Sequence, residues 1–351
     1  MQTNRLILGI YLHPSLWICD ESEHIDPKLI SREECLEVVF TKTLQNGIEV
    51  CIQRQGFIVV AFPESLLNTN ISKINTNNLL PIKAAQFSIS FFNALLFLIY
   101  DQTYKHHNGR FQSIKQAIGI SEIWKWLDDP SSELRDIAIQ QPAPIMKQDE
   151  MLSLDNVPHL FSKTIGNLTE VSKLFRMHLP IHILDQALDT MFIEGGAEIN
   201  WQLLSLLNKA VFITQKAEFE ESLVISWSVA EILIGIEWEN YISQTNRDVG
   251  ATGEKTVNSK RLDKLTSSNF DVSHRVEILE LAKVIPYELY KRSLNARTSR
   301  NNRLHYLKPV TQEESRNCFL LARDLLSRKM EISIDHPGAV YLHDEYMTHK
   351  P

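Results

Sequence analysis

The stretch "EFEESLVISWSVAEILIGIEWENYISQ" (Glu218 to Gln244) decides which kind of fold the second half of the chain can adopt. The middle of the stretch is apolar on nearly every side. A helix that is apolar most of the way round lies at the centre of a bundle or at an oligomer interface. We therefore expect a helical bundle around it. Its apolar residues recur at helical spacing, namely Phe219, Leu223, Trp227, Ala230, Leu233, Ile234 and Trp238.

Helical patterns continue on both sides of this stretch. Downstream, after the polar loop 245–259, Pro286 suits the first position of a helix and Pro309 closes it. Thr311 and Glu314 form a capping box that opens a final helix to about Arg328. The other expected helices cover residues 167–177, 181–194, 200–214, 260–266, 273–284 and 287–306.

The N-terminal third has strand patterns instead, rich in β-branched residues. Asn46-Gly47 is a strong signal for a β-hairpin, and Gln55-Gly56 marks a second turn. These turns predict a small antiparallel meander from the strands 5–12, 35–44, 48–55 and 57–62. The segment "SIKQAIGISEIWKWLDD" (Ser113 to Asp129) is interpreted as one or two helices, and the four tryptophans Trp124, Trp126, Trp227 and Trp238 as core residues.

Together these patterns predict an α+β fold in two domains. Residues 1–140 form the small antiparallel β-meander domain, and residues 150–330 form a mostly α-helical bundle. The proline-containing segment 140–150 is the expected linker. Residues 331–351 are a tail without clear periodicity.

Bulk composition limits the classes of function. The 351 residues carry a net charge of -7, so nucleic acid can be bound only through a local basic patch. The four cysteines lack metal-ligand spacing, and we expect no structural zinc and no cofactor. The opening residues do not resemble a signal peptide, and the apolar run Ala84 to Tyr100 is expected to be a buried helix, with no membrane partner. These features favour a cytoplasmic protein.

The basic patch is found in "RTSRNNRLHY" (Arg297 to Tyr306). Between Pro286 and Pro309 six positive residues face one negative residue, a net charge of +5 in an acidic protein. Asn301 and His305 form an i,i+4 pair, flanked by arginines. Because asparagine is a poor helix former, two adjacent asparagines in a helix cost stability that a functional site would explain.

This residue set suits cleavage of RNA without a metal. The ribose 2′-OH attacks its own phosphate once a base removes its proton, and the leaving 5′-oxygen needs an acid. Histidine can do either near neutral pH. Guanidinium groups are always charged and bind phosphate oxygens in a fork, so they can hold the developing negative charge.

The segment "NARTSRNNRLHYLKPVTQEESRNCFLLARDLLS" resembles the last two helices of the HEPN superfamily. The hallmark of that family is an arginine, four to six residues and a histidine, often with a polar residue directly after the arginine. Arg300, Asn301 and His305 match this pattern. Glu231, within the apolar middle of the long helix, is expected to be a supporting carboxylate that needs an arginine partner. The resemblance covers about residues 200–330 only.

The resemblance implies a metal-independent endoribonuclease with Arg300, His305 and Asn301 as catalytic residues. Arg297 and Arg303 would bind the RNA. The site is composite in this family, which implies a homodimer, and many members are bacterial toxins or phage-defence effectors with a regulatory or antitoxin partner.

Other interpretations of the basic stretch stay open. It can be a solvated helix face, part of a non-catalytic HEPN module that binds nucleotides or a partner, or part of a helical adaptor or sensor. A combined version has the N-terminal domain sense a trigger while the C-terminal domain cuts RNA. The sequence names neither the RNA nor the trigger.

Overall fold

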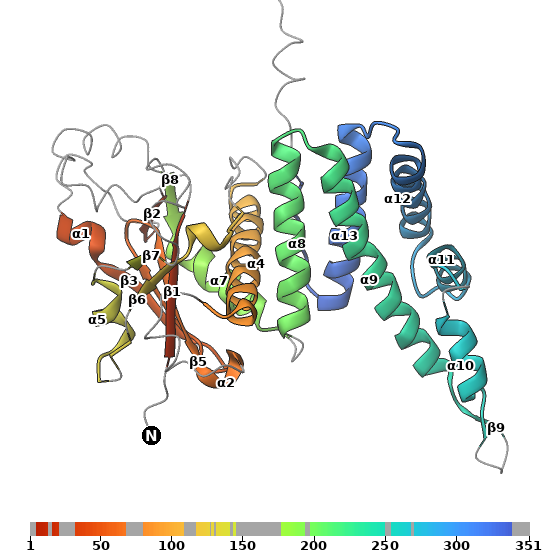
Figure 1. Ribbon diagram of the computed structural model, residues 1–351, viewed down its shortest axis with the longest axis horizontal. Helices are drawn as coiled ribbons and strands as arrows, with labels where there is room; N and C mark the ends of the chain where they lie inside the picture. The colour runs from red at the N-terminus through yellow and green to blue at the C-terminus, as the bar shows by residue number, and fades with distance from the viewer. Residues whose placement is uncertain are drawn as a thin grey trace, which may run out of the picture. The chain divides into compact units, whose positions relative to one another are not determined.

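The computed structural model of the protein divides into two compact units, Met1–Ser205 and Leu206–Pro351 (Figure 1). It describes residues 5–12, 16–20, 32–67, 80–108, 117–126, 128–129, 131–140, 143–144, 177–193, 197–249, 254–267 and 270–338. The division falls inside helix α8 (Ala197–Gln215), later in the chain than the expected boundary at 140–150. Most of that expected linker, residues 167–176 of the expected helix at 167–177 and residues 339–351 lie outside the described residues, and Met177 belongs to a strand.

Unit 1 is built on one antiparallel sheet of six strands in the order β3-β4-β5-β1-β6-β7. The meander β3-β4-β5 was predicted, and the expected α+β layout is confirmed. Gly47 and Gly56 form its turns with positive φ angles of 79° and 89°, which glycine adopts without strain. The strands are β1 (Arg5–Tyr11), β3 (Val38–Thr43), β4 (Glu49–Gln53), β5 (Phe57–Pro63), β6 (Trp124–Trp126) and β7 (Ala143–Pro144).

The two faces of this sheet have separate apolar cores. On one face, Phe62 packs edge-on against Phe91 of helix α4 (Ile82–His106), with ring centroids 5.1 Å apart. On the other face, Phe57 meets Trp126 at 5.2 Å in a cluster that includes Ile137 of α5 (Leu134–Ala138). The alternation of side chains along each strand therefore buries both faces. The other described helices of unit 1 are α1 (Arg32–Leu36), α2 (Glu64–Leu67), the 3-10 turn η1 (Ile120–Glu122), α7 (Ile181–Met191) and the first part of α8.

Helix α4 is the apolar helix expected from the run Ala84 to Tyr100. Of the described helices it alone is long and apolar enough to cross a membrane, and 61% of its most apolar window is buried. Phe91 also packs on Trp201 at 5.2 Å, and Phe97 is fully buried. The helix is a core element of unit 1.

In its described part, the prediction of helices over Ser113 to Asp129 is wrong except for the 3-10 turn η1. Residues 124–126 form strand β6, which pairs with β1. Trp124 and Trp126 are two residues apart, a strand period that places both rings in the same cluster. A Cβ on Gly9 of β1 would lie 2.7 Å from the Trp126 ring, so the absence of a side chain at Gly9 makes room for this tryptophan.

A short parallel pair was not predicted. Strand β2 (Leu16–Cys19) pairs with β8 (Met177–Pro180), directly before α7. The two segments lie 161 positions apart in register, from Leu16 to Met177, and no local sequence signal joins them.

Unit 2 is a helical bundle, as expected, and its helices follow the predicted helix boundaries closely, although it begins at Leu206 rather than near residue 150. The long central helix α9 (Phe219–Thr245) packs against α11, α12 and, most extensively, α13. Trp227 and Trp238 are buried, as predicted. The polar loop 245–259 contains a small hairpin, β9 (Asp248–Val249) and β10 (Glu254–Lys255). The other helices are α10 (Ser259–Thr266), α11 (Val272–Leu281), α12 (Tyr287–Tyr306) and α13 (Gln312–Met330).

The first residues of the tail pack on α13. His336 is buried, its ring meets Phe319 at 5.5 Å, and its Nδ1 accepts the backbone N–H of Gly338. Arg323 donates to the His336 carbonyl at 2.9 Å. Residues 331–338 therefore belong to unit 2, which the sequence did not reveal.

Candidate functional site on helix α12

Helix α12 presents the Arg and His residues of the motif because only part of its length has an apolar face. Leu289, Ser293 and Ala296 are its buried residues, spaced for one stripe, and the stripe ends before Arg297. The helix stops at Leu307, which takes the left-handed conformation with φ 52°. Its N-cap is Pro286, one position before the first helical position that was predicted for this proline, and residues 304–306 at its end are exposed.

Three of the arginines of α12 reach carboxylates of neighbouring helices. Arg292 pairs with Asp324 of α13 at 2.7 Å. Arg297 pairs with Asp271, the N-cap of α11, at 2.8 Å. Arg303 lies 3.9 Å from Glu220 in the first turn of α9, a long ion pair. Arg297 and Arg303, the expected RNA-binding residues, therefore share their charge with acidic neighbours.

Arg300 differs from these three. Within the described part of the chain it contacts no carboxylate, and its Nη1 donates to the neutral Oδ1 of Asn301 at 2.9 Å. Its side chain is half-buried. A guanidinium held by a neutral amide keeps its full charge for an anionic ligand. The structure thus brings together Arg300 and Asn301, two of the three predicted catalytic residues.

His305 lies on a different side of the same helix. His305 is five positions after Arg300, which corresponds to about 140° around the axis, and no hydrogen bond between the two side chains occurs among the described residues. All six residues from 304 to 309 are exposed. Leu304, Tyr306 and Leu307 are 47%, 71% and 75% exposed. His305 therefore lies in an exposed stretch that also carries three exposed apolar side chains.

Glu231 does not occupy the buried position expected of it. It is exposed on α9, and no ion pair of Glu231 occurs in the described ranges. The expectation that its carboxylate is buried and needs an arginine partner is wrong. The helix has one solvent-facing side, and Glu231 and Ile232 lie on it.

The carboxylate at the centre of the α11–α12 contact is Asp271, which sequence reasoning missed. It accepts from Ser273 at 2.6 Å, contacts His274 Nδ1 at 2.8 Å and binds Arg297. The Ser273 hydroxyl first, then the contacts to His274 and Arg297, lower the pKa of Asp271 to about 2 despite the opposing effect of burial. Its position as an N-cap before an apolar pattern is the sequence signal that could have revealed it.

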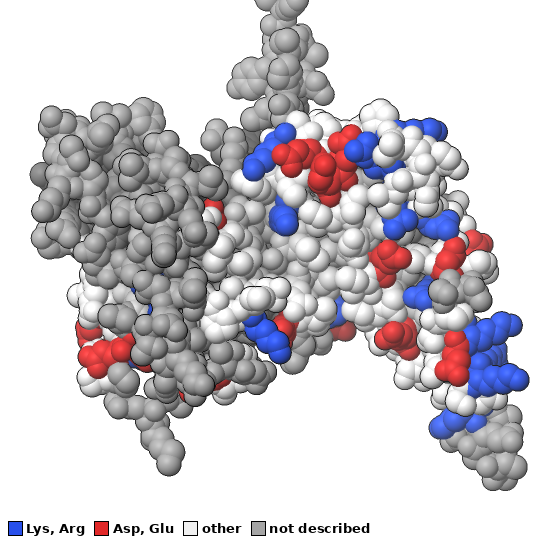
Figure 2. Space-filling model, viewed as in Figure 1, with Lys and Arg blue, Asp and Glu red and all other residues white. Residues whose placement is uncertain are grey.

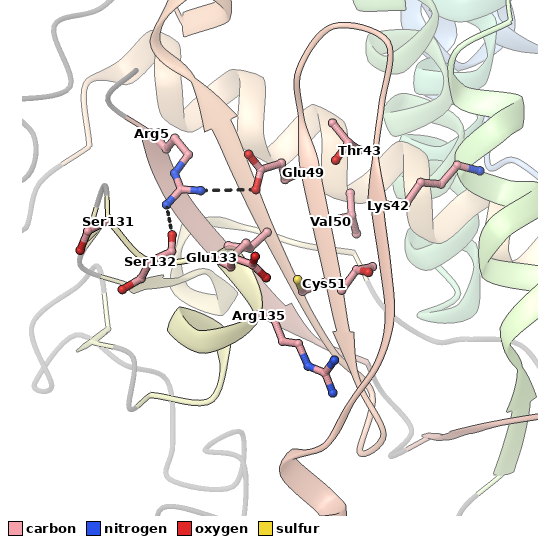
Figure 3. Close-up of a pocket in the computed structure, with 12 residues that line it drawn as sticks. Arg5, Lys42, Thr43, Glu49, Val50, Cys51, Ser131, Ser132, Glu133 and Arg135 are labelled. Carbon is pink, nitrogen blue, oxygen red and sulfur yellow. Dashed lines mark hydrogen bonds and ion pairs between the residues drawn. The ribbon is translucent and has the colours of Figure 1, made fainter. Parts of the chain in front are cut away.

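Unit 1 contains a separate polar cavity of about 530 Å³ between the sheet and α5 (Figure 3). Its charged groups are largely neutralised. Arg5 binds Asp128 at 2.9 Å and Glu49 at 3.3 Å, and Lys42 contacts Asp185 and Asp189 of α7. Figure 3 shows the Lys42 side chain directed away from the other lining residues. We therefore regard α12 as the stronger candidate site.

No set of three or more His, Cys, Asp or Glu side chains arranged for a metal ion occurs among the described residues. Comparisons with protein-family models, with curated proteins and with solved structures found no match to the chain. An assignment of function therefore depends on the residues and their geometry.

Proposed function

We propose that the protein is a metal-independent endoribonuclease of the HEPN type, acting as a homodimer in the cytoplasm. The observation that carries the proposal is the state of Arg300. It is the arginine that the motif names, and it is also the one arginine of α12 without a carboxylate partner among the described residues. Sequence pattern and ion pairing thus select the same side chain independently.

In this proposal the guanidinium of Arg300 binds the non-bridging oxygens of the scissile phosphate. Asn301 fixes the orientation of the guanidinium through the hydrogen bond at 2.9 Å. His305 acts on a proton, either removing it from the 2′-OH or giving one to the leaving 5′-oxygen. The products are a 2′,3′-cyclic phosphate and a free 5′-hydroxyl, and no metal takes part.

The distance between Arg300 and His305 around the helix supports a site shared by two copies. A second copy that covers Leu304, Tyr306 and Leu307 brings another α12 to the same surface, so that Arg300 of one copy and His305 of the other face one phosphate. Covering these exposed apolar side chains also supplies a driving force for the association.

The test is RNA cleavage by purified protein in EDTA, followed by mapping of the product ends. We expect His305→Ala to abolish cleavage while circular dichroism and dimer mass stay unchanged. His107→Ala, which removes an exposed histidine of unit 1, is the matched control and should cut RNA like the wild type. Undiminished cleavage by His305→Ala, or RNA binding without cyclic-phosphate ends in the wild type, rules out the proposed nuclease.

A further inference from the structure

Helix α10 lies wholly at the surface and carries an excess of positive charge. None of its eight residues, "SKRLDKLT", is buried. Lys260, Arg261 and Lys264 face one acid, Asp263, for a net charge of +2. Figure 2 shows Lys and Arg side chains gathered over this helix. Because no face of this helix is buried, packing against a core does not explain its basic composition.

The helix is held in place without using its lysines. Asn258 caps it by accepting from the backbone N–H of Arg261 at 3.0 Å, and the Arg261 guanidinium donates to the Thr256 carbonyl. Trp238 of α9 donates its indole N–H to the Leu265 carbonyl at 3.1 Å. The side chains of Lys260 and Lys264 make no hydrogen bond or ion pair with a described residue, and they lie one helical turn apart on one face.

A series of stacked rings leads from Trp238 toward α12. Trp238 stacks on Phe270 with centroids 5.1 Å apart and planes 23° apart, and Phe270 lies 5.6 Å from His274. The side chain of His274 is 63% exposed, and Asp271 fixes its Nδ1 at 2.8 Å. Asp271 also binds Arg297 of α12. The stack therefore ends in an oriented, accessible ring beside the proposed site.

We propose that this surface is the docking track for single-stranded RNA. Lys260 and Lys264 bind backbone phosphates, and the exposed face of His274 stacks on a base. Free cations beside an accessible ring are the combination with which proteins bind single strands. The inference rests on the proposed function, because it supplies the substrate-binding surface of that nuclease.

Binding is measured with a fluorescent single-stranded RNA in the His305→Ala background, where the RNA is not cut. Lys260→Ala/Lys264→Ala should weaken binding about tenfold at 0.1 M salt and reduce the slope of log affinity against log salt by about 1.4, as expected for two lost contacts to single-stranded phosphates. The matched control is Lys209→Ala/Lys216→Ala, one exposed lysine of α8 and one directly after its last residue, which should leave affinity and slope unchanged.

The base stack is tested separately. His274→Ala should weaken RNA binding about fivefold, the lower end of the effect of one lost base–aromatic stack, whereas His274→Phe should retain it. Inorganic polyphosphate, which has no bases, should bind equally to His274→Ala and His274→Phe. It should bind more weakly to Lys260→Ala/Lys264→Ala.

The outcomes separate the two proposals. A parent protein that binds no RNA at all removes both of them. RNA binding that is unaffected by the α10 lysine changes, or affected equally by the α8 control, removes the docking track and leaves the nuclease. Loss of RNA affinity in His274→Phe as large as in His274→Ala removes the stacking role.

Discussion

At the scale of single residues, the ion-pair partners distinguish side chains that look alike in the sequence. Arg292, Arg297, Arg300 and Arg303 all lie on α12, yet only Arg300 has a neutral partner among the described residues. The spacing of four positions predicted that Asn301 and His305 share one face of the helix, but the expectation that Arg300 flanks His305 on that face is wrong, because the two lie about 140° apart around the axis. The spacing could not predict the partners of the arginines, because Asp271, Asp324 and Glu220 come from three other helices. Glu231 was wrongly expected to be buried, because its exposure depends on which helices pack around α9 and not on its own sequence neighbours.

Arg300→Ala should reduce RNA cleavage about a hundredfold or more, because it removes a preorganised charge from the phosphate. The control is Arg292→Ala on the same helix, which should cut RNA normally. Its partner Asp324 keeps a second ion pair, with Arg323 at 2.6 Å, so no carboxylate is left alone. Single-turnover cleavage rates, with thermal unfolding of each variant, check this prediction. Equal losses of activity in both variants would contradict it.

His336 should make the stability of unit 2 depend on pH. Burial, with the Arg323 charge beside it, lowers the pKa of His336 from 6.5 to about 3. Between these two values the unfolded chain binds a proton that the folded chain does not, so the free energy of unfolding falls as the pH falls from 6.5 toward 3. Above pH 6.5 this contribution to pH dependence is absent.

The measurement is urea unfolding at a series of pH values for the wild type and His336→Asn. Asparagine keeps an acceptor for the Gly338 N–H but does not titrate. Between pH 6.5 and pH 4, we expect the free energy of unfolding of the wild type to fall by at least about 1 kcal/mol more than that of the variant. This amount corresponds to a difference in pKa of less than one unit. If the free energies of unfolding of the two proteins change with pH in parallel, His336 does not cause the pH dependence.

At the scale of elements, local signals predicted helix ends well and short strands poorly. Helix α12 begins and ends where Pro286 and the residues before Pro309 predict, and α13 opens with the predicted capping box. Strands β6 and β2 were missed, because their residues become strands through pairing with β1 and β8 rather than through their own pattern. A three-residue strand is too short to show a period.

Thr311→Ala should lower the free energy of unfolding by about 1 kcal/mol through loss of the cap. The Thr311 Oγ1 accepts from the Glu314 N–H at 3.2 Å, and the Glu314 carboxylate accepts from the Thr311 N–H at 2.9 Å. That backbone hydrogen bond is the first cause of the lowered pKa of Glu314. Thr298→Ala, at an exposed position inside α12, is the control and should be neutral or slightly stabilising, since alanine is the better helix former. Denaturant titration distinguishes the two outcomes.

At the scale of the whole molecule, the α+β class and the succession of a sheet unit and a helical unit could be predicted from the sequence. The division inside α8 could not, because the sequence shows one uninterrupted helical pattern there. Nor could the sequence show that residues 304–309 are all exposed, since that depends on which helices surround α12.

If the proposed dimer forms, Leu307→Glu should raise its dissociation constant about tenfold or more. A tenfold change corresponds to about 1.4 kcal/mol, which the loss of buried apolar surface at Leu307 can supply. Leu281→Glu is the matched control, because Leu281 is 71% exposed against 75% for Leu307 and lies at the end of α11. Sedimentation equilibrium measures the constants, and cleavage rates should follow the dimer fraction. A monomeric wild type that cuts RNA would disprove the shared site.

The place of β1 in the sheet has a consequence for how unit 1 is made. β1 comes before every other described element in the sequence but lies in the interior of the sheet, between β5 and β6. Arg5 at its start is bound by Asp128, 123 residues later. On the ribosome, therefore, the emerging first strand has both of its edges unpaired until distant partners have been synthesised. High contact order of this kind slows folding, so the unpaired edges of the nascent strand stay open to non-native pairing while translation continues.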